Sequence, residues 1–171
     1  MELNAVYNLI IALAVLVAML CVYIVYLIRS RREDAEKAAY FLYFEMIRRS
    51  DLIPHFIELA KTENLSLDFA ALIEKRAKTM GLEQFDQSKK TQEESLWNNF
   101  NEILAQMKTA LSKNGQIQVA ALEKDWREAT SRVNNMSAQY NHLVEKYNKL
   151  ANNIILKPLS LIVKAGKMPS F

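Results

Sequence analysis

The feature that most constrains this chain is a long uncharged run near its start. No charged side chain lies between residues 3 and 28. As a helix, residues 5–28 would extend about 36 Å at about 1.5 Å per residue, more than the roughly 30 Å hydrocarbon core of a bilayer. Tyrosines suit the two membrane interfaces, and they lie near the ends of the run at Tyr7, Tyr23 and Tyr26. The sequence therefore predicts a membrane-spanning helix over 5–28, preceded by a short extracytoplasmic N-terminus, residues 1–4.

The residues that flank this run favour a permanent anchor over a cleaved leader. A signal peptide has basic residues before its apolar run and small residues after it, whereas here Glu2 precedes the run. A lipoprotein signal is disfavoured because Leu20, a large residue, comes directly before Cys21, the only cysteine. Basic residues follow the run at Arg29, Arg31 and Arg32. By the positive-inside rule, these arginines predict an N-terminus outside and all later residues in the cytoplasm.

The remainder of the chain is expected to be helical. Three glycines and three prolines interrupt the whole sequence, and no stretch alternates as a strand would. The apolar pattern predicts helices over 33–61, 66–80, 91–113 and 117–156. The predicted fold is therefore all-α, with one transmembrane helix followed by a long antiparallel bundle of about four helices over residues 29–157. The net charge of +3 is too small to indicate nucleic-acid binding.

Local residue types predict where these helices begin and end. Ser66 would cap the second helix, and a polar loop would follow over Gly81–Lys90. The run Thr91–Glu94 has the pattern of a capping box at the start of the third helix. Asn114-Gly115 would end that helix, and Pro158 would end the fourth.

The first helix is expected to break near its middle. Arg48 and Arg49 would end one piece, where cations are favoured. Asp51 would then cap a second piece, with Leu52 at the first helical position and Pro54 at the third. A proline in a first turn sacrifices no backbone hydrogen bond, so helix structure accounts for this segment, and a binding role is the alternative.

The two later helices carry regular apolar stripes. In the third, apolar residues recur at steps of four and three at Leu96, Phe100, Ile103, Met107 and Ala110. In the fourth, the same heptad-like steps run through Leu122, Trp126, Ala129, Val133, Met136, Tyr140, Leu143, Tyr147, Leu150 and Ile154. Such coiled-coil spacing predicts a helix packed lengthwise against its partners, and it leaves self-association open.

Two motifs resemble the LemA family of bacterial membrane-anchored helical proteins. The first comprises Arg48, Arg49, Asp51, Leu52, Ile53 and Pro54. The second comprises Arg132, Tyr140, Asn141, Val144, Tyr147 and Asn148. The ending Lys167-Met168-Pro169-Ser170-Phe171 is similar to that family's aromatic terminus. The resemblance covers essentially the whole chain.

This resemblance implies an anchored antiparallel bundle in the bacterial inner membrane, with no assigned biochemical activity. Some members of the family are linked to membrane shaping, and some are encoded beside membrane zinc metalloproteases. The expected function is therefore a non-catalytic scaffold or interaction protein. The alternatives are a protein that remodels the bilayer directly and a regulator or adaptor of a membrane protease.

Motifs for catalysis or cofactor binding were not found in the sequence. His55 and His142 lie in different segments without zinc-ligand spacing, and no phosphate-binding loop or nucleophile elbow is present. The adjacent acids Glu93-Glu94 are explained by a helix start, where negative charge is favoured. We therefore expect no enzyme activity, metal, cofactor or small-molecule substrate, and we expect the bilayer and other membrane proteins as partners.

The C-terminal tail, residues 158–171, interleaves lysines with large apolar residues. Lys157, Lys164 and Lys167 are candidate contacts to anionic lipid headgroups, because interfacial segments combine positive charge with apolar groups. In the alternative, residues 154–163 pack on the end of the bundle itself and cover the start of the first cytoplasmic helix.

Overall fold

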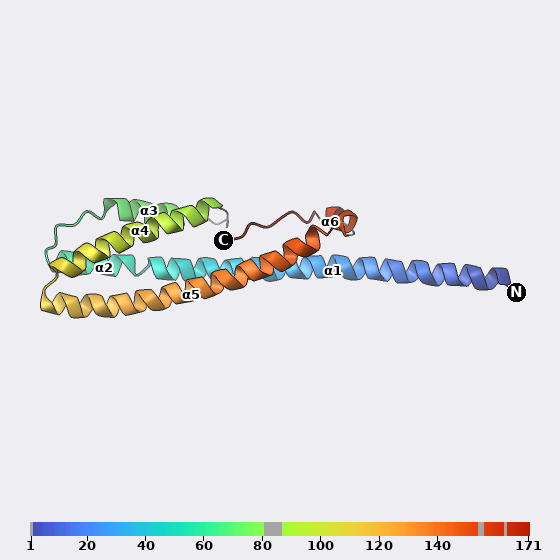
Figure 1. Cartoon of the computed structure of the whole chain (residues 1–171), viewed down its shortest axis with the longest axis horizontal. Coiled ribbons are helices and arrows are strands. Elements are labelled where there is room, and N and C mark those ends of the chain that lie inside the picture. Colours follow the sequence, from blue (N-terminus) through green and yellow to red (C-terminus); the bar gives the residue numbers. More distant parts are fainter. Residues whose placement is uncertain (1, 81–86, 154–155, 163) are drawn as a thin grey trace. The chain divides into compact units, whose positions relative to one another are not determined.

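The computed structural model describes residues 2–80, 87–153, 156–162 and 164–171, and within these ranges the chain forms helices and no strand. The helices, labelled in Figure 1, are α1 (Glu2–Ser50), α2 (Ile53–Thr62), α3 (Ala70–Met80), α4 (Gln87–Ala110), α5 (Lys113–Ala151) and α6 (Lys157–Ile162). The expectation of an all-helical chain is confirmed for the described residues. A LemA-like bundle of four helices remains a prediction.

The chain divides into two compact units, and long helices contribute to both. The anchor unit contains residues 1–36 and 143–168, and the core unit contains residues 37–142 and 169–171. Each unit therefore combines a part of α1 with a part of α5.

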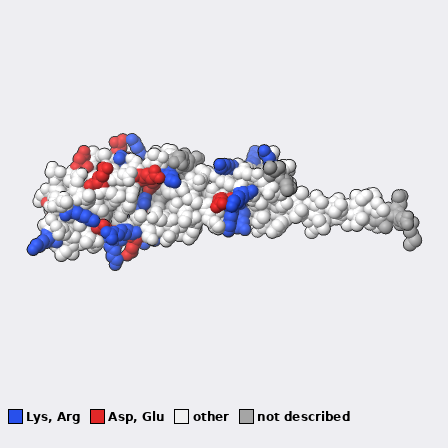
Figure 2. Space-filling model, in the orientation of Figure 1, with Lys and Arg blue, Asp and Glu red and all other residues white. Residues whose placement is uncertain are grey.

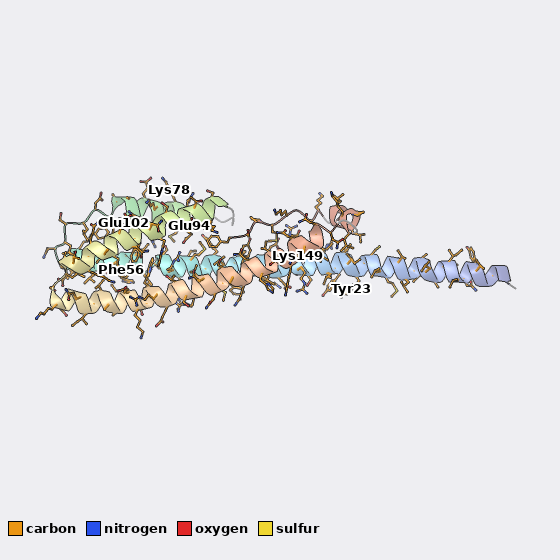
Figure 3. The ribbon with its side chains drawn as sticks, viewed as in Figure 1. Tyr23, Phe56, Lys78, Glu94, Glu102 and Lys149 are labelled. Atoms are coloured by element: carbon orange, nitrogen blue, oxygen red, sulfur yellow. The ribbon has the colours of Figure 1, made fainter. Side chains whose placement is uncertain are left out.

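In the anchor unit, most of the first half of α1 has no protein around it. A window of this helix has a mean hydropathy of 2.9 and is 0% buried. By length and composition it can cross a membrane. Tyr23 points away from the helix in Figure 3, and Figure 2 shows no charged atoms along this stretch. An exposed apolar surface of this size is what a membrane-spanning helix presents to lipid.

The end of the expected span is packed against protein. Ile28 is 1% exposed and shares a small core with Tyr147 and Ala151 of α5, and Ile24 packs against the same core. The side chain of Ile28 therefore faces a helix, although it belongs to the run expected to face lipid. No helix break separates this run from the residues that follow, since α1 continues to Ser50.

The core unit is held together by apolar side chains of α2, α4 and α5, with one contribution from α3. Phe56 of α2 lies at its centre, as Figure 3 shows. Its ring meets Phe100 of α4 edge-on at 5.0 Å and Trp126 of α5 at 6.2 Å, and the last two rings stack at 3.9 Å. Such aromatic contacts add to the free energy gained by burying apolar area.

The predicted break in the helix over 33–61 is confirmed, but its predicted geometry is wrong. The first helical residue after the break is Ile53, and Pro54 is the second. Leu52 occupies the cap position without a side-chain hydrogen bond, and the carboxylate of Asp51 instead pairs with Arg76 at 2.8 Å. The proline ring excludes the carbonyl four residues earlier, at Ser50, from helical bonding, so the break follows from Pro54 and needs no cap at Asp51.

The predicted starts of the second and third helices are also wrong. The second helix begins at Ala70, because Asp68, not Ser66, accepts the hydrogen bond from the Ala70 amide at 2.9 Å. The third begins at Gln87, so Thr91–Glu94 lies inside α4 and caps nothing, and the predicted loop does not extend to Lys90. The rest of that loop, 81–86, lies outside the described residues.

The turn between the last two long helices also differs from the prediction. Asn114-Gly115 lies in the first turn of α5 rather than at the end of α4. Ser112 caps α5, since its hydroxyl accepts a hydrogen bond from the Gly115 amide at 3.1 Å. At its other end α5 stops at Ala151, before Pro158, which lies in α6.

The stripe predicted on α5 is largely buried. Its fully buried members are Trp126, Ala129, Val133, Tyr140 and Tyr147. Leu122, Met136, Leu143 and Leu150 are half-buried, and Ile154 lies outside the described residues. On α4 the stripe is correct except for Ala110, which is exposed.

Candidate functional site

A buried ion pair joins α1 to α4 in the core unit. The Arg49 guanidinium donates a hydrogen bond to the Glu93 carboxylate, and the two side chains are only 10% and 8% exposed. The arginine carbon also lies over the rings of Trp97 and Trp126, 5.6 and 5.8 Å from their centres. Burial lowers the pKa of Arg49 and raises that of Glu93, while the opposite charge of each partner acts against both shifts.

A second buried cation lies one turn before Glu93 on α4. Lys89 is 1% exposed, and its ammonium donates to the carbonyl of Thr79 on α3 at 2.5 Å. The same group lies 4.9 Å from the ring centre of Tyr43. The Tyr43 hydroxyl in turn donates to the Met80 carbonyl at 3.0 Å. These contacts fix the end of α3 against α1 and α4 through polar groups.

A pocket of about 300 Å³ opens beside the ion pair. The residues that line it include Arg49, Glu93, Trp97, Thr130 and Phe171. The Thr130 hydroxyl is buried and has no hydrogen-bond partner. The pocket thus combines an aromatic face with charged and hydroxyl groups, the types of side chain that orient a ligand in a binding site.

The helix break is held by the guanidinium of Arg76 from α3. Its Nε donates to the carbonyl of Ser50 at 3.1 Å and contacts the Ser50 hydroxyl at 3.2 Å. The same side chain pairs with Asp51. Arg76 therefore satisfies the carbonyl that Pro54 excludes from the helix ladder. In this part of the motif, Ile53 is buried and packs in the core.

The two resembling motifs meet at one carboxylate in the core unit. Glu45 of α1 accepts a hydrogen bond from Arg132 of α5 at 3.1 Å and lies 3.9 Å from Arg48. Both arginine side chains are more than 40% exposed. Solvent-exposed pairs of this kind stabilise a fold by at most about 1 kcal/mol, so they orient the helices more than they hold them.

In the anchor unit, side chains of α5 form hydrogen bonds with the main chain of the C-terminal tail. The Tyr147 hydroxyl donates to the carbonyl of Gly166 at 2.9 Å. The Asn148 amide donates to the carbonyl of Met168 at 2.8 Å, and its oxygen accepts from the Met168 amide at 2.9 Å. We call this pair the Tyr147–Asn148 clasp. An asparagine can replace a neighbouring strand in this way because its amide carries a donor and an acceptor side by side.

The core unit contains the same arrangement seven residues earlier on α5. The Tyr140 hydroxyl donates to the carbonyl of Pro169 at 2.7 Å. The side-chain nitrogen of Asn141 donates to the main-chain oxygen of Phe171 at 2.5 Å, and its side-chain oxygen accepts from the Phe171 amide at 2.8 Å. We call this pair the Tyr140–Asn141 clasp. Both tyrosines are 1% exposed, and desolvation raises the pKa of each.

The remaining candidate residues lie at the surface of the anchor unit. Arg29 is exposed, Arg31 is half-buried, and Arg32 pairs with Glu36 at 2.8 Å. The three candidate lipid-contacting lysines are exposed; they are Lys157, Lys164 and Lys167. Part of the tail packs on protein, since Ala165 and Met168 contact the core around Ile28.

Sequence reasoning missed the buried charges of the core unit. Glu93 was interpreted as a helix-start residue, yet it lies inside α4 and contacts Arg49. The spacing of these residues could have predicted their burial. Lys89 and Glu93 continue the steps of four and three that begin at Leu96 toward the start of the helix. No spacing in the sequence marks the pairing of Arg76 with Asp51 or of Glu45 with Arg132, since these partners lie 25 and 87 residues apart. In the part of the chain that the structure describes, no group of histidine, cysteine, aspartate or glutamate side chains could hold a metal ion.

No family model, curated protein or solved structure matches this chain. The resemblance to the LemA family therefore stands on the two motifs and the tail.

Proposed function

We propose that this chain is a membrane-anchored helical interaction protein of the LemA type, which binds other membrane proteins and catalyses no reaction. The observation that carries the proposal is the uncharged first half of α1, which is long enough to cross a bilayer and unburied. The anchor lies in a bacterial inner membrane, with the N-terminus outside and both ends of α5 in the cytoplasm, as the arginines after the run favour.

A second exposed surface supports binding to another protein. On the core-unit part of α1, Tyr40, Phe41 and Phe44 are 67%, 58% and 55% exposed. These positions share one helix face, and large aromatic residues are enriched at protein interfaces. Three exposed aromatics in consecutive turns indicate a surface that is covered in the working complex.

The anchor is tested by placing charge in it. Leu13→Arg with Leu16→Arg should reduce alkali-resistant membrane association of the full chain, because arginine is costly at the centre of a bilayer. Ile73→Arg is the matched control, since Ile73 is an exposed apolar residue of the core unit. Equal retention of both variants in the membrane would contradict the proposal.

The interaction surface is tested by replacing Tyr40, Phe41 and Phe44 with serine in the full chain. A partner that co-purifies stoichiometrically from detergent extracts should be lost with this variant and kept with Ile117→Ser, a control at another exposed apolar residue. Retention of the partner by the triple variant would show that this face is not the binding surface.

A specific observation also favours direct action on the bilayer as a second candidate. Leu161 of α6 is 71% exposed, and Lys157 and Lys164 on either side of it are exposed as well. An apolar side chain between lysines matches an interfacial segment. A fluorophore on Leu161→Cys, in a Cys21→Ser chain within nanodiscs, should shift to the blue with anionic lipid and revert with salt. The same label on His142→Cys should not respond. Equal spectra at both positions would reject lipid contact at α6.

A further inference from the structure

We propose that each clasp is a binding site for the main chain of an extended peptide, and that the tail of a second copy of this chain replaces the chain's own tail in it. The copies would then be joined by reciprocal exchange of residues 164–171.

The first argument is that the clasps bind main-chain atoms of the tail. The six hydrogen bonds described above, three in each clasp, all join an α5 side chain to a main-chain oxygen or amide of the tail. No tail side chain takes part in these bonds. Any extended segment that presents a carbonyl followed by a free amide at the right distance can therefore be bound in the same way, which is how strand addition works.

The second argument concerns spacing. The two clasps are seven residues apart on α5, and the residues they bind are three apart in the tail, at 166 and 169 and again at 168 and 171. Within each unit the offset is the same, because the tyrosine binds a carbonyl two residues before the residue that the asparagine binds.

The third argument identifies the occupant. Gly166, Lys167, Pro169 and Ser170 are exposed, so the site places little demand on their side chains. The two residues that a clasp asparagine holds by both amide and carbonyl, Met168 and Phe171, are instead half-buried. Met168 packs on the small core of the anchor unit, and Phe171 lines the pocket beside Arg49 in the core unit. A second copy supplies a segment that carries both anchors.

The fourth argument is a strained residue where the tail begins. Lys164 has a φ of 50°, in the left-handed region that lysine rarely adopts. This conformation belongs to the form in which the tail turns back on its own α5. Short connections under strain promote the exchange of an element between copies, because the exchanged form keeps every contact and releases the strain.

The test uses single cysteines in full-length chains that carry Cys21→Ser. One chain carries Asn148→Cys and a longer, N-terminally tagged partner carries Met168→Cys; both keep the Tyr140–Asn141 clasp. A short thiol-reactive cross-linker should join the two chains in detergent. With His55→Cys in place of Asn148→Cys, the joined product should fall to background, because His55 is exposed and makes no clasp contact.

A second pair keeps the result independent of any one substitution. Asn141→Cys with Phe171→Cys probes the other clasp and should give the same joined product. The proposal is overturned if both pairs join only when the two cysteines are in one chain, with the product between chains no greater than in the His55→Cys control.

The role of the strained connection is tested in the same assay. Lys164→Gly should reduce the product between chains about fivefold, because glycine adopts the left-handed region without the usual cost and so stabilises the self-bound form. Lys167→Gly is the matched control, since it adds equal flexibility without relieving a positive φ. Equal products from the two variants would overturn the strain argument.

Discussion

Tyr140 and Tyr147 are buried phenols whose hydroxyls donate to tail carbonyls. Burial raises the pKa of both above the ordinary value of about 10. The native state therefore holds these protons more tightly than the unfolded chain does. Their contribution to stability is complete below the ordinary tyrosine pKa and is lost as the pH rises from that value through the raised one.

This linkage predicts an alkaline weakening that depends on the two tyrosines. The full chain should lose thermal stability as the pH rises above about 10, and Tyr140→Phe with Tyr147→Phe should lose less over the same interval. Spectroscopic titration of phenolate should show two late-ionising tyrosines in the parent chain. Identical alkaline slopes for the parent and the double variant would contradict the assignment.

Trp126 combines deep burial with an unsatisfied donor. It is 3% exposed, it contacts Phe56, Trp97 and Phe100, and its indole nitrogen has no hydrogen-bond partner. Trp126→Ala should lower the free energy of unfolding by about 3–5 kcal/mol through lost contacts and a cavity. Trp126→Phe should cost less than half as much, because no hydrogen bond is lost with the indole. Denaturant unfolding of the full chain measures both, and equal losses would show that the nitrogen has a partner.

The buried residues of the core could be predicted where the spacing of apolar residues along a helix alone decides which of them are buried. The heptad-like steps through Trp126, Val133 and Tyr140 indicated the buried face of α5 because burial follows helical spacing. The tyrosine and asparagine pairs were recognised only as a motif. Their role depends on a tail that folds back onto α5, and no local signal encodes a return of the chain.

Among the helices, the break between α1 and α2 is the best explained element boundary. Pro54 excludes the Ser50 carbonyl from the helical hydrogen bonds, and Arg76 of α3 donates a hydrogen bond to this carbonyl instead. Pro54 itself is exposed and lacks only an amide that a first turn leaves unbonded.

This arrangement predicts unequal effects of two substitutions. Pro54→Ala should change the free energy of unfolding by no more than about 0.5 kcal/mol, as is usual for an exposed site. Arg76→Ala should cost about 1–2 kcal/mol, because it leaves the carbonyl of buried Ser50 without its partner. Thermal unfolding of the two full-length variants makes the comparison. A larger loss of stability from Pro54→Ala than from Arg76→Ala would show that the proline, and not the Arg76 hydrogen bond, stabilises the break.

Helix ends were predicted less well than helices because capping signals are local and redundant. Thr91–Glu94 has the pattern of a capping box, yet α4 begins earlier, at Gln87, where Lys89 and Glu93 gain buried partners. Tertiary contacts thus outweigh a cap, which contributes about 1 kcal/mol. The start of α5 at Lys113, ahead of a glycine that otherwise ends helices, follows instead from the local cap at Ser112.

At the scale of the whole molecule, the anchor was the most predictable feature. A run of uncharged residues from 3 to 28 has few alternatives, and the structure leaves most of it unburied. The orientation across the membrane is a separate prediction, which rests on Arg29, Arg31 and Arg32. The division of the chain into two units was not predictable, since α1 and α5 run through the boundary without a change in sequence pattern.

Orientation can be checked with reporters fused after Phe171. A reporter that is active only in the cytoplasm should be active there, and one that requires the periplasm should be inactive. Replacing Arg29, Arg31 and Arg32 with glutamine should reduce the difference between the two reporters. If the periplasmic reporter is the active one in the parent chain, the charges after the span do not set its orientation.

The way the tail is held also bears on its lifetime in a cell. Proteases and aggregating strands both take hold of an extended segment through its free amides and carbonyls. At Met168 and Phe171 those groups are already engaged by asparagine side chains. The side chains of Met168 and Phe171 are half-buried, and their main-chain groups are already hydrogen-bonded. Degradation at these two residues would therefore begin only after a clasp opens.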